Sequence, residues 1–157
     1  MFGFKEEHPL YAVATGEILS LASVPDQAFA SGLLGEGYAI DPMEGVIFAP
    51  VSGRVAQVTE GRHAYRIESE DGLDILVHIG VDTVELSGKP FTPKVKPGDR
   101  VEVGDVLAEV DLDCIRKAGY SAITPVLITN VDLVKHCKRA KGFAQGGKTV
   151  AATYRME

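Results

Sequence analysis

The chain has 157 residues, of which 45% are hydrophobic and 24% charged, a composition typical of one globular domain with its own core. Its formal net charge of −6 argues against binding nucleic acid through the phosphate backbone. The sequence has no run of about 18 apolar residues and no hydrophobic signal core near Met1. We therefore expect a cytoplasmic protein without a membrane span.

The first part of the chain predicts short strands separated by turns. We expect residues 1–10 to form a flexible leader, and so short a leader after Met1 favours a free-standing protein. Phe29 and Leu34 are apolar residues in a segment rich in turn formers, so they either pack under a loop or mark a binding surface. Strands are predicted around this segment at residues 11–13, 16–21 and 38–40.

A hairpin is predicted in the middle of the chain. Residues 63–69 and 73–79 alternate in polarity on either side of Asp71-Gly72, a dipeptide that tolerates the positive φ of tight turns. The alternation places His78 on the opposite face to the Ile and Val side chains of its strand. Pairing outward from the turn brings His63 and His78 to the same end of the hairpin, so we expect the two rings to be adjacent.

The last part of the chain mixes strands with short helices. Asp111 is a predicted helix cap, with Gly119 as the stop after a helix at residues 111–118. Asn130 is predicted to cap one or two helical turns that reach His136. Strands are expected at residues 45–50, 53–60, 101–103, 106–110, 124–129 and 148–155.

Many short strands separated by Gly, Pro and Asp turns predict an all-β fold, an antiparallel sandwich or barrel with one or two short helices. The sequence shows no low-complexity linker and no repeat with a period of about 20–50 residues, so residues 1–157 are expected to form a single domain. Cys114 and Cys137 lack CxxC spacing, which favours reduced structural thiols.

The histidine pair leaves two chemistries open. The sequence contains no GxSxG elbow, P-loop or dinucleotide fingerprint. His63 and His78 either hold a metal ion with help from a partner's carboxylate, or transfer a phosphoryl group. In the second case one neutral imidazole is the nucleophile, and the other donates a hydrogen bond to the phosphate. His8 in the leader and His136 between lysines are expected to be solvated.

Several segments resemble one family closely. LVHIGVDTVELSGKPF, preceded by HAYRIES and FAPVSGRV, is similar to the enzyme IIA component of the glucose family of the bacterial sugar phosphotransferase system. VPDQAFASGLLGEGYAIDP, GDRVEVGDVLAEVDLD and TPVLITN extend the resemblance from about Thr15 to the C-terminus. It implies a β-sandwich phosphocarrier that accepts phosphate from HPr and passes it to a cysteine of a IIB domain, for coupled sugar import.

The resemblance also assigns residues to roles. His78 matches the histidine that is phosphorylated on Nε2, and His63 matches its phosphate-supporting partner. The positions that match the surface for docking partner proteins are acidic at Asp26 and Asp82 and apolar at Phe29, Leu34, Leu76 and Val84. The sequence departs from relatives at Gly61, where a Thr that orients the upstream histidine is common, and at Gln27 and Ala28, where more apolar residues are usual.

Two other interpretations are weighed against this one. APVSGRV and VKPGDRVEVGDVLAEV also resemble biotinyl and lipoyl carrier domains, but the place of their modified lysine holds Asp111 and the residues after it, and Lys117 comes late in a predicted helix. A purely regulatory protein is the third interpretation, binding permeases or glycerol kinase according to its phosphorylation state. No cofactor is expected, apart from the alternative of a zinc ion shared by the histidine pair with a partner.

Overall fold

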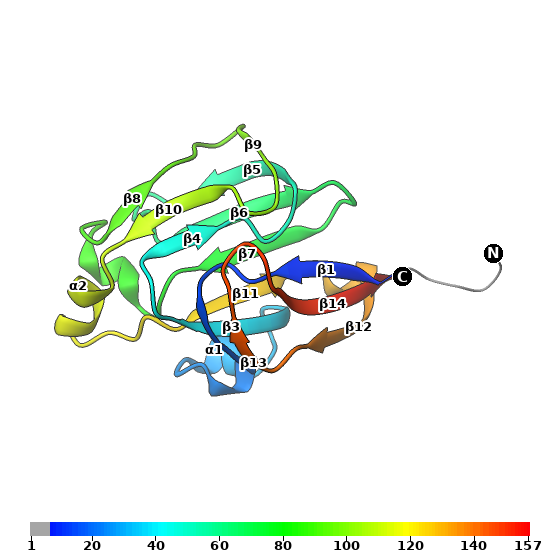
Figure 1. Ribbon diagram of the computed structural model, residues 1–157, viewed down its shortest axis with the longest axis horizontal. Coiled ribbons are helices and arrows are strands. Elements are labelled where there is room, and N and C mark those ends of the chain that lie inside the picture. The colour runs from blue at the N-terminus through cyan, green and yellow to red at the C-terminus, as the bar shows by residue number, and fades with distance from the viewer. Residues whose placement is uncertain (1–6) are drawn as a thin grey trace.

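The computed structural model describes residues 7–157, which form three antiparallel sheets around one main core (Figure 1). The largest sheet carries the predicted hairpin near its centre. Its strands, in spatial order, are β13 (Gly142–Ala144), β2 (Gly16–Leu19), β3 (Glu36–Pro42), β11 (Thr124–Ile128), β7 (Asp74–His78), β6 (Ala64–Ser69), β5 (Gly53–Val58) and β9 (Arg100–Val101).

Two smaller sheets and a few short helices complete the fold. One small sheet contains β1 (His8–Tyr11), β14 (Val150–Met156) and β12 (Val134–Arg139), and the other β4 (Val46–Phe48), β10 (Val106–Val110) and β8 (Phe91–Pro93). The helices are α1 (Gln27–Ala30), α2 (Leu112–Lys117) and 3₁₀ turns at Leu21–Ser23, Thr83–Leu86 and Val131–Leu133. This architecture confirms the predicted all-β fold with short helices.

The two faces of the large sheet are packed differently. In β7, Ile75 and Val77 are fully buried in the main core, which all three sheets enclose. Leu76 points to the other face, because side chains alternate along a strand, and there it packs in a second apolar cluster with Phe29 of α1 and Leu127 of β11. His78 shares this outer face with Leu76, as the alternation predicted.

The β6–β7 hairpin has the predicted pairing. Ala64 lies opposite His78 and Glu68 opposite Asp74, so the pairing is unbroken along the two strands. Gly72 has φ +88 and closes that turn through a hydrogen bond from its N–H to the carbonyl of Ser69. The register therefore fixes which residues reach the end of the hairpin farthest from the turn.

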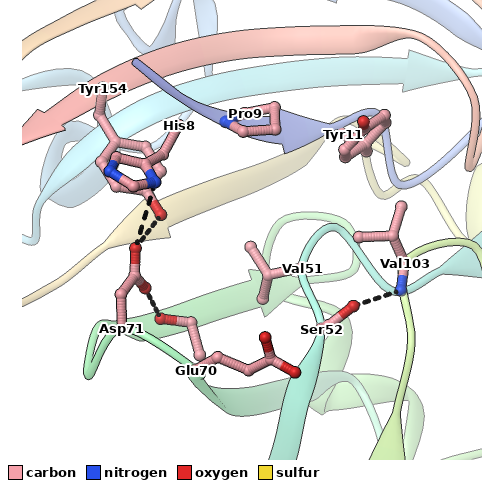
Figure 2. Close-up of a pocket in the computed structure, with 10 residues that line it drawn as sticks. His8, Pro9, Tyr11, Val51, Ser52, Glu70, Asp71, Val103 and Tyr154 are labelled. Atoms are coloured by element: carbon pink, nitrogen blue, oxygen red, sulfur yellow. Dashed lines mark hydrogen bonds and ion pairs between the residues drawn. The ribbon is translucent and has the colours of Figure 1, made fainter. Parts of the chain in front are cut away.

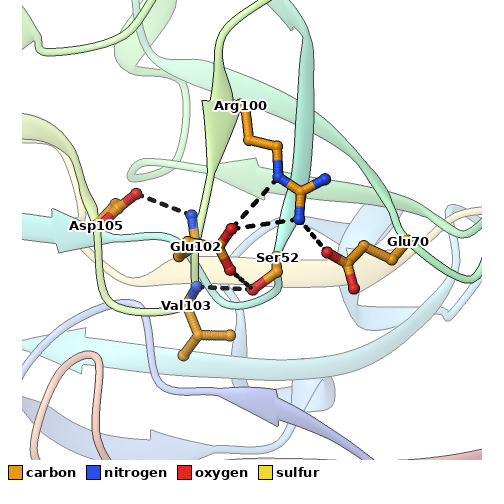
Figure 3. A network of polar contacts seen from close by, with 6 residues as sticks. All are labelled: Ser52, Glu70, Arg100, Glu102, Val103 and Asp105. Atoms are coloured by element: carbon orange, nitrogen blue, oxygen red, sulfur yellow. Dashed lines mark hydrogen bonds and ion pairs between the residues drawn. The ribbon is translucent and has the colours of Figure 1, made fainter.

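The turn end of the hairpin is tied to neighbouring segments by polar contacts. The Arg100 guanidinium donates to Glu70 and to Glu102, and Ser52 Oγ donates to Glu102 while it accepts from the Val103 N–H (Figure 3). These bonds connect the hairpin turn with the short edge strand β9, with the residues that follow it and with the residue before β5. They anchor the turn end of the hairpin.

Two local predictions are wrong. Residues 8–10 were placed in a flexible leader, but they belong to β1, which pairs with β14, and Leu10 is fully buried. Residues 1–6 of that leader lie outside the described part of the chain. His136 was placed on a helix begun by Asn130, but helical geometry ends at Leu133 and β12 follows. His136 is exposed as expected, at a bulge where its φ is +53.

Candidate active site

His78 is the last residue of β7, and the turn after it orients its ring. Its Nδ1 lies 2.8 Å from the carbonyl oxygen of Gly80. A carbonyl can only accept, so Nδ1 carries the proton and Nε2 of the neutral ring keeps its lone pair. Gly80 has φ +78, and a Cβ there would lie 2.8 Å from the Ser121 carbonyl oxygen, so the turn requires glycine.

His63 stands beside His78, as the hairpin register predicted. It directly precedes β6, and its carbonyl accepts a hydrogen bond of 2.7 Å from the N–H of Ile79. The two imidazole centroids are 5.1 Å apart, with the rings inclined at 76°. His63 is buried and His78 half-buried, so the pair forms a partly covered site at the open end of the hairpin.

Both imidazoles are neutral near pH 7 because burial dominates their electrostatics. Burial lowers the pKa of His78, against the opposing effects of its bond to Gly80 and of the Asp26 and Asp82 carboxylates. Burial also lowers the pKa of His63, a positive charge on His78 lowers it further, and a backbone hydrogen bond to Gly61 acts in the opposite direction. A neutral His78 is the form that can act as a nucleophile.

The expected docking residues differ in burial and in their contacts with the pair. The Phe29 ring packs against His78, with centroids 5.1 Å apart, and it is buried together with half-buried Leu76. Leu34 and Val84 are 43% and 51% exposed, so they present apolar surface to solvent. A Cβ on Gly61 would lie 3.7 Å from Val84, which places this side chain next to the loop before His63.

The two acidic residues differ in their local structure. Asp26 accepts a hydrogen bond of 2.9 Å from the Ala28 N–H and thereby caps α1. Asp82 is exposed, has φ +60 and makes no capping bond with its side chain. Both carboxylates act electrostatically on His78, so they form a negative rim around the pair.

Sequence reasoning missed Thr59. Its Oγ1 lies 3.3 Å from Nδ1 of His63, the contact that relatives were expected to supply from the position of Gly61. The chain reverses at Arg62, which has φ +62, and this reversal returns Thr59 to the ring. No spacing rule in the sequence predicts that reversal.

The remaining groups considered for chemistry lie elsewhere. Lys117 ends α2, which follows β10 after one residue, so no exposed hairpin presents a lysine there. Cys114 and Cys137 are free thiols, and burial raises the pKa of Cys137 to about 11. Within residues 7–157 no group of three or more His, Cys, Asp or Glu side chains is placed to hold a metal ion. No helix in that range is long and apolar enough to cross a membrane.

A surface hollow of about 440 Å³ lies at the turn end of the hairpin (Figure 2). Neither His63 nor His78 lines it. His8 stacks on Tyr154 at a centroid distance of 5.3 Å, and both approach Asp71. His8 is therefore half-buried in a cluster and not solvated as expected. His8, Asp71 and Tyr154 of this hollow already contact one another, so the histidine pair remains the candidate site.

Comparison with known proteins decides the family. Residues 8–134 match the family described as phosphoenolpyruvate-dependent sugar phosphotransferase system, EIIA 1. The chain belongs to this family. Membership confirms the resemblance seen in the sequence and the expected role as an EIIA component of the phosphotransferase system for sugar import.

Relatives of this EIIA occur both alone and as part of longer proteins. The glucose-specific EIIA component of Halalkalibacterium halodurans is 39% identical over 153 residues, which cover 97% of this chain and 88% of the relative. The glucose-specific EIICBA component of Streptococcus pneumoniae is 45% identical over 143 residues, and the chain spans only 20% of that relative. A solved structure, the glucose permease IIA from Mycoplasma capricolum, has a TM-score of 0.89 at 35% identity and covers 97% of this chain and 99% of that one.

Proposed function

We propose that this EIIA takes a phosphoryl group from phosphorylated HPr onto Nε2 of His78 and passes it to a cysteine of a IIB domain. The observation that carries the proposal is the bond from Nδ1 of His78 to the Gly80 carbonyl, which leaves the Nε2 lone pair as the nucleophile. The proposal includes the cytoplasmic location expected from the sequence, where both partner proteins would meet the chain.

Each half-reaction exchanges one bond to phosphorus for another. In the first, the P–N bond to the HPr histidine breaks as the P–Nε2 bond to His78 forms. In the second, the P–Nε2 bond breaks as a cysteine thiolate of IIB forms a P–S bond. His63, 5.1 Å away between ring centroids, supports the phosphoryl group with a hydrogen bond, and positioning with charge stabilisation provides most of the catalysis.

The docking surface proposed for both partners is the rim around His78. Phe29, Leu34, Leu76 and Val84 supply apolar contacts, and Asp26 with Asp82 supply negative charge for a basic donor. Relatives named EIICBA and EIIBCA components support a IIB domain as the acceptor. A phosphoryl group on His78 would add up to two negative charges beside Phe29, so regulatory targets such as permeases or glycerol kinase would bind the unphosphorylated form.

We extend the proposal to a zinc ion shared with such a target, although phosphoryl transfer itself requires no cofactor. His63 and His78 would supply two nitrogen ligands, and the target would supply a carboxylate. Zinc should then tighten a target complex of the wild type but not of His63→Gln, and equal tightening in both would remove His63 from the metal site.

The test begins with phosphoenolpyruvate, enzyme I and HPr, followed by intact mass and site mapping under alkaline conditions that preserve phosphohistidine. One added phosphate on His78, absent from His78→Ala and retained in a His136→Ala control, is the expected result. His63→Gln should accept phosphate but transfer it slowly to IIB, because an amide donates a hydrogen bond but carries no charge. Labelling that persists in His78→Ala would assign the reaction to another residue.

A further inference from the structure

Nδ1 of His63 lies against Thr59 and Gly61, two residues of the loop that precedes this histidine. Thr59 Oγ1 is 3.3 Å from Nδ1 of His63. At Gly61 the fit is closer, because a Cβ on this residue would lie 2.8 Å from Nδ1 and 3.2 Å from Cε1 of the ring. The ring thus occupies space that any side chain at position 61 would need.

The hydrogen bonds of the Thr59 hydroxyl determine its role toward the ring. Oγ1 accepts from the Ala64 N–H at 3.1 Å and lies 3.3 Å from the Ala64 carbonyl, to which only the hydroxyl proton can donate. A hydroxyl has one proton and two lone pairs, so one lone pair remains for Nδ1–H of His63. The backbone of Gly61, which also hydrogen-bonds to His63, lies on the same Nδ1 side of the ring. Both contacts of the ring are thus on the Nδ1 side, and Nε2 is the nitrogen available to a phosphoryl group.

We propose that Thr59 is a positioning residue: with the bare backbone of Gly61, it holds His63 as the Nδ1–H tautomer with Nε2 left for the phosphoryl group on His78. This inference rests on the proposed function. When the phosphoryl group arrives, its negative charge favours uptake of a proton from solvent on Nε2 of His63. The imidazolium then donates from Nδ1 to Thr59 and from Nε2 to the phosphate. Its positive charge therefore lies next to the phosphoryl group without any movement of the ring.

The proposal also gives Gly61 a role. Thr59, four residues upstream, lies 3.3 Å from Nδ1 of His63, and the ring fills the space that a side chain at position 61 would need. Gly61→Thr should therefore impair transfer, because its Cβ displaces the ring.

The experiment compares wild type with Thr59→Val, Thr59→Ser and the exposed-site control Thr92→Val. Nitrogen-15 NMR of the unphosphorylated protein reports the tautomer of His63, and single-turnover transfer from phosphorylated His78 to a IIB domain reports its use. We expect Thr59→Val to shift His63 toward the Nε2–H tautomer and to slow transfer roughly three- to tenfold, the effect of one hydrogen bond. Thr59→Ser and Thr92→Val should match the wild type, and the KM for IIB should stay unchanged in all variants.

Two outcomes would overturn the inference. One is a His63 tautomer and a transfer rate in Thr59→Val equal to those of the wild type. The other is a Thr59→Ser variant as slow as Thr59→Val, which would assign the loss to loop packing. If wild-type His78 itself takes no phosphate, the proposed function fails, while the NMR comparison still decides whether Thr59 orients His63.

Discussion

Two fully buried tyrosines differ in how their hydroxyl groups are hydrogen-bonded. Tyr38 Oη donates to the Tyr11 carbonyl at 2.7 Å and accepts from the Val13 N–H at 3.0 Å, which ties β3 to the segment at and after β1. Tyr65 Oη is buried without a hydrogen-bond partner in the described chain, and burial raises the pKa of Tyr65 to about 12. One hydroxyl therefore satisfies two backbone groups, and the other is itself unsatisfied.

We expect Tyr38→Phe to lower the free energy of unfolding by about 1–3 kcal/mol, because it leaves a buried N–H and a partly buried carbonyl without their partner. Tyr65→Phe should leave stability unchanged or raise it, since it removes a buried polar group that has no partner. Urea unfolding of the two variants beside wild type measures the difference. Equal losses of unfolding free energy in the two variants would show that Tyr65 Oη does have a hydrogen-bond partner.

At the scale of one element, α1 connects the negative rim to the second apolar cluster. The helix is a single turn capped by Asp26, and its buried residue is Phe29, which packs against His78. The Asp26 side chain therefore has a structural role, as a cap, and an electrostatic role, as a charge near His78. Asparagine caps a helix as well as aspartate does, so the two roles can be separated.

Asp26→Asn should keep α1 folded and weaken association with basic HPr at low salt, with a smaller effect at high salt. Asp26→Ala should also cost about 1 kcal/mol of stability through loss of the cap. Asp82→Asn is the matched charge control, because Asp82 makes no capping bond and asparagine tolerates its φ of +60. Affinity losses that do not depend on salt would show that these residues act through local folding instead.

At the scale of the whole molecule, the histidine pair makes stability depend on pH. Burial lowers the pKa of both His63 and His78 in the folded chain, so the unfolded chain binds more protons between the lowered values and the ordinary value of about 6.5. The free energy of unfolding should therefore fall as pH drops through this range. Above a pH of about 6.5, titration of the two histidines should no longer lower it. The Asp26 and Asp82 carboxylates that face His78 reduce the size of the effect.

Urea unfolding over a series of pH values tests this expectation against a His63→Gln, His78→Gln double variant. The stability of the variant should depend less steeply on pH below about 6.5, because its amides do not titrate. Phosphate acceptance by wild type should also persist somewhat below that pH, where His78 is still neutral. Parallel stability curves for the two proteins would contradict the lowered pKa values.

Local patterns in the sequence already determined the framework of the site. Alternation of polarity with a period of two residues predicted the faces of β7, and Asp71-Gly72 predicted the turn that brings His63 and His78 together. Asp111 caps α2 through the Cys114 N–H as expected, because capping requires residues only three positions apart. These features depend on residues close together in the chain, so they can be predicted from the sequence.

The tertiary structure alone decided which distant groups meet. His8 joins a strand because Tyr154, near the other end of the chain, pairs with it. The Asn130 side chain bonds to the Asp74 N–H at 2.9 Å and to the Gly72 carbonyl at 3.1 Å, so it does not cap the short 3₁₀ turn that begins at Val131. Thr59 reaches His63 only because the loop reverses between them. The contacts of His8 and Asn130 depend on chain closure that no local period encodes, so their energy becomes available only once the sheets have assembled. The contact of Thr59 is local, but it depends on a turn conformation that the sequence pattern does not predict.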